Sequence, residues 1–285
     1  MATRRGLLGI LAVAAPATLG VGLWPKMLRA EAAAAGLISP NVCSLMPEVT
    51  EGPYYIDPNL VRADIREGKA GANMVMRLQI VDTDCSAIAG ARVDIWHCDA
   101  QGNYSGFKSQ GSDAASDTER QTFLRGTQMT DSSGLVAFQT IYPGWYRGRT
   151  THIHFKVFLD KTNLLTGQIF FPDALSQYIY DYAPAYGDRA SARDTVNATD
   201  GIAAQAGSGA YAHVAEQPDG YDAALVVGVS RDEVSQAGQR QLGPPPGGDD
   251  GAPSNMPGGP GGPGDNGDDS VIINDPANLI PGLES

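Results

Sequence analysis

The feature that most constrains this chain is residues 140–155, which read T-I-Y-P-G-W-Y-R-G-R-T-T-H-I-H-F. Side chains two positions apart on a strand point to the same face, so His152 and His154 would lie side by side, with Ile153 facing the opposite layer. The same stretch contains a Pro-Gly turn signal, two tyrosines and two arginines. This is more polar chemistry than a packing strand needs, and it predicts a functional site on a strand.

The surrounding sequence has the pattern of many short strands. Alternating apolar and polar residues predict strands at 74–81, 91–97, 122–130, 135–141, 150–159, 168–171, 210–213 and 221–229. Residues 131–134 predict a hairpin-type turn, 172–182 a short helix, and 188–205 a polar loop with one helical turn. Short strands, regular turn signals and almost no long helix predict an all-β fold, an antiparallel β-sandwich with short helices and long loops.

Residues 1–35 have the composition of an export signal. Paired arginines at Arg4 and Arg5 precede a modest apolar run and small residues near Ala32, which is typical of the twin-arginine route for folded proteins. The apolar run has a borderline length for a membrane anchor, which is the alternative interpretation. We expect the protein outside the cytoplasm, in an extracellular or periplasmic location, and off the membrane once the signal is removed.

The rest of the chain divides by composition into an arm, one domain and a tail. Residues 237–285 are acidic and rich in glycine and proline, so they cannot bury enough apolar surface to offset chain entropy, and we expect a largely disordered tail. Residues 36–72 form an N-terminal arm, and 73–236 match one β-sandwich domain in size. With 32 acidic and 20 basic residues, the chain has no basic stripe for phosphates, which excludes nucleic acid as a partner. The sequence leaves the oligomeric state open.

The histidine pair is a common bidentate metal unit, although such a pair can also be structural. His97, on an expected core strand, and His213, far downstream, do not complete a ligand set, and no carboxylate lies close in sequence. Phenols crowd the pair instead. Tyrosinate is a hard anionic donor that suits Fe(III) better than zinc or copper.

Three motifs in order carry a family resemblance: W-H-C-D-A-Q-G-N-Y-S-G-F at 96–107, F-L-R-G-T-Q-M-T-D-S-S-G at 123–134, and the stretch at 140–155. Together they resemble the intradiol ring-cleavage dioxygenases, Fe(III) enzymes that open catechols between the two hydroxyl-bearing carbons. The T-E-G-P-Y-Y segment at 50–55 and the export signal make the chain most similar to the secreted, extracellular branch. The resemblance covers about residues 43–200. It implies an iron cofactor, a small aromatic diol and O2 as substrates, and cis,cis-muconate-type products.

Carried over residue by residue, the resemblance places the metal ligands at Tyr104, Tyr146, His152 and His154. Tyr146 matches the family's P-G-x-Y form, whereas Tyr142 precedes the proline and becomes a scaffold residue. The loop between the second tyrosine and the histidines is shorter here than in the cytoplasmic enzymes.

The resemblance also implies catalytic roles for Arg149, Tyr146 and Gln168. Arg149 stands three residues before the first histidine, like the family's arginine that faces the bound substrate, and Gln168 matches a glutamine in the same pocket. Thr150 replaces the proline that usually follows the arginine, which is a departure from the pattern.

Four further residues have two interpretations each. Tyr54 and Tyr55 either anchor the arm or bind substrate together with Arg149 and Gln168. Arg125 and Gln128 either orient ligands or are exposed strand residues.

The cysteines and the function class complete the expectations. An exported protein with three cysteines can hold one disulfide, and the resemblance implies Cys43 with Cys85, leaving Cys98 as a buried thiol. One alternative is a catalytically silent β-sandwich that binds aromatic or polysaccharide material. Another is a zinc or copper hydrolase or redox protein built on the two histidines. The motifs do not specify which catechol is used.

Overall fold

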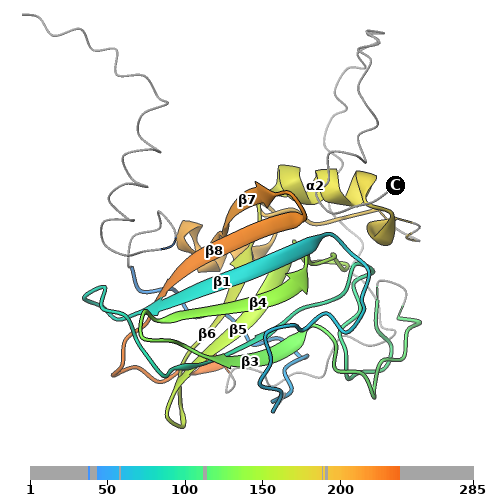
Figure 1. Ribbon diagram of the computed structural model, residues 1–285. Coiled ribbons are helices and arrows are strands. Elements are labelled where there is room, and N and C mark those ends of the chain that lie inside the picture. The colour runs from blue at the N-terminus through green and yellow to red at the C-terminus, as the bar shows by residue number, and fades with distance from the viewer. Residues whose placement is uncertain are drawn as a thin grey trace, which may run out of the picture.

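The computed structural model describes residues 38, 44–57, 59–111, 114–187, 189 and 192–237. Within them, eight strands form two four-stranded sheets that lie face to face (Figure 1). One sheet has the order β4-β1-β8-β7, with β4 at Leu135–Ile141, β1 at Asn73–Val81, β8 at Gly220–Gly228 and β7 at His213–Gln217. The other has the order β3-β2-β5-β6, with β3 at Arg125–Met129, β2 at Arg92–Trp96, β5 at His152–Leu159 and β6 at Thr162–Phe170. The predicted all-β sandwich is confirmed.

The main core fills the space between the two sheets. On β1 every second side chain from Met74 to Ile80 is buried in it, and β5 contributes Ile153, Phe155 and Val157 from the other sheet. Burying apolar surface contributes about 25 cal/mol per Å², so this alternation fixes which face of each strand turns inward. The outer face of β5 is therefore left for the polar side chains.

Short helices connect β6 to β7. Helix α2 spans Asp173–Tyr182 and α3 spans Gly201–Ala206, and 3-10 turns lie at Pro184–Tyr186 and Ser208–Ala210. Asp200 caps α3, since its side chain accepts from the backbone N–H groups of Ile202 and Ala203. The helix expected near 172–182 and the helical turn expected within 188–205 are both present.

Three strand-level predictions are wrong. The strand expected at 210–213 instead begins at His213, because a 3-10 turn occupies Ser208–Ala210. The turn at 131–134 is not a hairpin, since it carries the chain from β3 in one sheet to β4 in the other. The sandwich is also not wholly antiparallel: β1 and β8 pair in parallel, with Met74 opposite Tyr221.

Residues 44–57 run from the edge of the first sheet across the outer face of the second. Leu45 bridges to Gly228 of β8, and the Val49 N–H donates to the Thr166 carbonyl of β6 at 3.2 Å. Further along, Glu51 forms an ion pair with Lys156 of β5 at 2.5 Å. This part of the predicted arm therefore covers the face on which the histidines lie.

Of the cysteines, Cys85 is disulfide-bonded and Cys98 is a buried free thiol, as expected for the latter. Cys43, the expected partner of Cys85, lies outside the described residues, as do the predicted export signal and nearly all of the predicted tail. In the described part of the chain, no helix combines the length and apolarity that crossing a bilayer requires.

Candidate metal centre

The outer face of β5 presents His152 and His154 side by side, as the strand alternation requires. Both side chains are buried, at 2% and 1% exposure, although they point away from the apolar core. The His152 Nδ1 lies 2.7 Å from the carbonyl oxygen of Thr150. A carbonyl oxygen can only accept, so the proton of this ring is on Nδ1 and the lone pair is on Nε2.

Three polar atoms converge on that lone pair. The Nε2 of His154 lies at 3.1 Å, the Oη of Tyr146 at 3.1 Å and the Oη of Tyr104 at 3.3 Å. Tyr104 comes from the turn after β2, and Tyr146 comes from the loop before β5. The fold thus brings together all four residues that the sequence predicted as ligands.

These four donors fit a ferric ion. Among the described residues no group of three or more His, Cys, Asp or Glu side chains could hold a metal, so any centre here depends on phenols. Two imidazole nitrogens gather here with two phenol oxygens, which become hard, anionic donors once deprotonated, and that is the type of oxygen ligand that Fe(III) prefers. A cation bound among these four atoms would accept their lone pairs.

Burial controls the protonation of these groups. It moves the pKa of both histidines well below the usual value, which keeps the imidazoles neutral and able to coordinate. Burial also raises the pKa of Tyr104 well above 10 and that of Tyr146 to about 12, with Arg149 opposing the rise at Tyr146. The phenols are therefore protonated at neutral pH, and a metal cation held by these residues would displace their protons.

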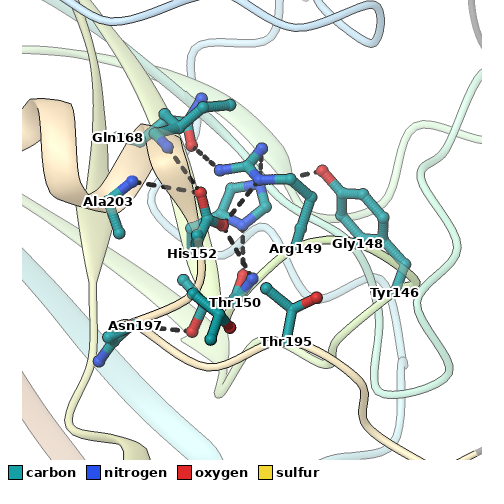
Figure 2. A network of polar contacts seen from close by, with 12 residues as sticks. Tyr146, Gly148, Arg149, Thr150, His152, Gln168, Thr195, Asn197 and Ala203 are labelled. Atoms are coloured by element: carbon teal, nitrogen blue, oxygen red, sulfur yellow. Dashed lines mark hydrogen bonds and ion pairs between the residues drawn. The ribbon is translucent and has the colours of Figure 1, made fainter. Parts of the chain in front are cut away.

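Arg149 lies at the edge of this cluster with its guanidinium fixed on three sides (Figure 2). Its Nε donates to Asp200 Oδ2 at 2.9 Å, its Nη2 donates to Gln168 Oε1 at 2.5 Å, and its Nη1 lies 3.5 Å from His152 Nε2. Burial tends to lower the pKa of Arg149, but Tyr146 and Asp200 outweigh it and raise the pKa. The site therefore holds a permanent positive charge beside the donor cluster.

Gln168 connects this arginine to the arm. It lies opposite His154 in the pairing of β5 with β6, and its Nε2 donates to the Thr50 carbonyl at 3.0 Å. Gln168 therefore lies beside Arg149 at the edge of the cluster, with both ends of its amide engaged.

Aromatic rings wall the cluster. Tyr54 stacks on Tyr104 with 4.4 Å between ring centroids, and Trp96 stacks on His154 at 4.9 Å with the two rings nearly parallel. Tyr55 packs against the ring of Trp96, and its hydroxyl donates to Asp94 at 3.0 Å. Of the two tyrosines predicted to bind substrate, Tyr54 thus lies against Tyr104, a predicted metal ligand, and Tyr55 is turned to the β2 side.

The arm approaches the cluster closely at Gly52. Its backbone has a φ of 71°, and a Cβ atom at this position would lie 3.0 Å from Cε1 of His154. A side chain here would be strained and would press on the imidazole, so glycine allows the arm to lie flat on the site.

Arg125 and Gln128, whose roles the sequence left open, have different positions. Arg125 is buried and donates to the carbonyls of Ser105 and Tyr54, so it joins the turn that carries Tyr104 to the arm. Gln128 donates to the Ala137 carbonyl of β4 at 2.8 Å and does not reach the cluster.

Three other candidates have structural roles. His97 is buried between the Cys98 carbonyl at 2.8 Å and Thr140 Oγ1 at 2.7 Å. Tyr142 lies in the main core with its hydroxyl on Ser176, which agrees with its predicted scaffold role. His213 lies at the start of β7, in the other sheet.

Asp200 is the site residue that the sequence analysis missed. It follows Arg149 by 51 positions, inside the segment 188–205 that was predicted as a polar loop with one helical turn and without a site residue. One signal was available, because an Asp immediately before G-I-A-A-Q-A is typical of a helix N-cap.

Comparison with known proteins identifies relatives of one kind. A family model described as Dioxygenase matches residues 49–205. The catechol 1,2-dioxygenase of Acinetobacter baylyi is 30% identical over 147 residues, which cover 43% of this chain and 45% of that protein. The protocatechuate 3,4-dioxygenase beta chain of Burkholderia cepacia is 31% identical over 159 residues, which cover 51% of this chain and 66% of that one. The chain spans about half the length of the catechol 1,2-dioxygenases that it matches.

Solved structures give the fuller match. The intradiol ring-cleavage dioxygenase from Tetranychus urticae is 35% identical with a TM-score of 0.62, over 68% of this chain and 98% of that chain. The dioxygenase domain of a dioxygenase–carbohydrate-binding fusion from Streptomyces sp. SirexAA-E has a TM-score of 0.50 at 22% identity, over 66% of this chain and 99% of that one. The second likeness shows a shared sandwich fold.

Proposed function

This chain belongs to the intradiol ring-cleavage dioxygenase family, and on that premise we propose that it is an Fe(III)-dependent oxidoreductase. It cleaves a catechol-type diol with O2 between the two hydroxyl-bearing carbons and releases a cis,cis-muconate-type product. The observation that carries the proposal is that two phenol oxygens and the Nε2 of His154 all lie within 3.3 Å of His152 Nε2. Relatives named as catechol and protocatechuate dioxygenases support the substrate class.

Tyr104, Tyr146, His152 and His154 would hold the iron. The chemistry that Fe(III) supplies is Lewis acidity toward the two catechol oxygens. The two phenols differ in what they can do around it. Tyr104 is 1% exposed and covered by Tyr54, whereas Tyr146 is only half-buried. Tyr146 is therefore the group that can swing aside and accept a proton from a catechol hydroxyl on its Oη, while Tyr104 stays in place.

Arg149 supplies positive charge to the reacting ring. Its Nη1 faces the cluster at 3.5 Å from His152 Nε2, while Asp200 and Gln168 hold the other two nitrogens. A charge that is already oriented in a water-poor site stabilises developing negative charge without reorganisation at the moment of reaction. Gln168 contributes by keeping the guanidinium against the arm.

Two measurements on the purified protein test the proposal. Metal analysis should find about one iron per chain, and tyrosinate bound to Fe(III) should give the protein a visible absorbance that makes it burgundy to red. Oxygen uptake with catechol should proceed with ring opening between the hydroxyls. A protein that contains zinc or copper in place of iron, or one that binds catechols without consuming O2, would contradict the proposal and favour one of the two alternative functions.

We also propose that the enzyme works outside the cytoplasm. The twin-arginine sequence at Arg4 and Arg5 supports this location, and so does the disulfide at Cys85, since disulfides persist in oxidising compartments. Fractionation of cells expressing the full chain should recover it outside the cytoplasm. Replacing both arginines by lysine should retain it inside, and unchanged export of that variant would exclude the twin-arginine route.

A further inference from the structure

Asp200 is a buried carboxylate that contacts Arg149 and that the proposed reaction does not yet use. It is 3% exposed, and its two oxygens accept four hydrogen bonds. Oδ1 caps α3 through the N–H groups of Ile202 and Ala203, at 2.8 and 3.2 Å. Oδ2 faces the site and accepts from Arg149 Nε and from the Thr150 N–H, both at 2.9 Å.

The Oδ2 contacts join two parts of the centre. The Thr150 N–H is held by Asp200, and the Thr150 carbonyl accepts from His152 Nδ1 at 2.7 Å. Arg149, bound to the same oxygen, is thus placed relative to the strand that carries the ligands. Of its three nitrogens, only Nη1 is left directed at the cluster, because Asp200 holds Nε and Gln168 holds Nη2.

The carboxylate is charged where it lies. Burial would raise the pKa of Asp200, but Arg149 and the Thr150 N–H outweigh burial and lower it. An anion against the far side of the guanidinium both orients Arg149 and keeps it from moving onto a bound catechol anion.

We propose that Asp200 is a positioning residue for ring cleavage, which fixes the Arg149 guanidinium with Nη1 toward the reacting ring. The inference rests on the proposed function, and it adds a residue far from the ligand motifs. Helix α3 has a second role in this arrangement, as the element that carries the carboxylate to the site.

The test compares D200N and D200S with the wild-type enzyme. Asn and Ser are both good N-cap residues, so α3 stays capped while the charge is removed. We expect kcat to fall about 10- to 100-fold, the usual cost of losing a residue that orients a catalytic group, with the larger loss for D200S. The KM should change less than about threefold. Iron content and the position of the visible band should stay unchanged, because the four ligands are intact.

D222N is the matched control. Asp222 accepts from Arg77 Nε at 2.9 Å, which is the same pairing as Asp200 with Arg149, but on the other sheet and partly exposed. Its kcat should equal that of the wild type.

A double-mutant cycle with R149A separates positioning from general structure. If Asp200 acts through Arg149, D200N should cost less than about twofold in the R149A background. An equal loss in both backgrounds would overturn the inference, as would folded, iron-loaded D200N with wild-type kcat. The inference would also be overturned if the loss of kcat in D200N were fully explained by a lower iron content of the variant. An inactive wild-type enzyme would instead refute the proposed function, so the two failures are distinguishable.

Discussion

On β5 the inner side chains Ile153, Phe155 and Val157 and the outer side chains His152 and His154 are all exposed by 2% or less. The inner set belongs to the apolar core that fills the space between the two sheets. The outer set meets phenols, an arginine and the backbone of the arm. Three of its four ring nitrogens lie within hydrogen-bond distance of a polar atom, and the fourth, His154 Nδ1, is buried without a partner among the described residues. Equal burial therefore does not mean equal function. The two faces of β5 differ in the groups that pack against them: apolar side chains on the inner face, and polar side chains and backbone on the outer face.

Removing a proposed metal ligand from the outer face should give the largest effect. His152→Ala deletes the nitrogen on which the other three donors converge, so activity should fall at least about 10³-fold, or about 4 kcal/mol of activation free energy. The visible absorbance should disappear with it. The unfolding free energy of the metal-free protein should fall by only about 1 kcal/mol, a typical value for one substitution. Denaturant unfolding checks the predicted change in stability, and oxygen uptake checks the predicted loss of activity. A variant with the full visible absorbance would show that His152 is not a ligand.

The corresponding substitution on the inner face of β5 is Phe155→Ala. Phe155 is fully buried in the main core, so the cavity should cost about 3–5 kcal/mol of unfolding free energy. For a domain of this size that is a fall of about 10 °C in Tm. Turnover per iron-loaded molecule at low temperature should stay within about fivefold of the wild type. If this variant lost iron as completely as His152→Ala, stability and metal binding could not be assigned to different faces of β5.

The covering arm is tested at Gly52. Gly52→Ala should cost about 1–2 kcal/mol for the left-handed backbone and should also lower activity about tenfold, because the new methyl would press on His154. Gly68→Ala is the control. Gly68 has a φ of 74°, but no atom lies within 4 Å of its added Cβ. It should show the same loss of stability with normal activity. Equal activity of the two variants would mean that the arm does not touch the working site.

The smallest effect is expected from Tyr55→Phe. The hydroxyl of Tyr55 donates to the fully buried Asp94, so its loss should cost about 1 kcal/mol of stability. The KM for catechol should stay within about twofold, since this hydroxyl is directed at β2. A tenfold rise in KM would instead indicate that the Tyr55 hydroxyl binds the substrate.

Local rules of the sequence predicted most of this arrangement. Strand alternation was sufficient to place His152 and His154 on one face and Ile153 on the other. The family motifs supplied Tyr104 and Tyr146, which no local rule could have joined to β5.

Two of the failures are long-range. Whether the turn at 131–134 closes a hairpin or changes sheets depends on which strands pair, and the turn residues do not encode that. Asp200 was readable as a helix cap, but its contact with Arg149 is made by the second oxygen of the same carboxylate, and only the fold reveals it.

The parallel pairing of β1 with β8 has a consequence for how the molecule is made. Met74 pairs with Tyr221, so the sheet gains its central contact only after almost the whole described chain has been synthesised. Pairings between such distant segments are slow to form, because the entropy of closing a long loop is lost before any contact stabilises the pairing. On the ribosome, the last described strand is therefore the one that completes the sandwich. Until it arrives, the edge of β1 that it will cover is open to pairing with other chains.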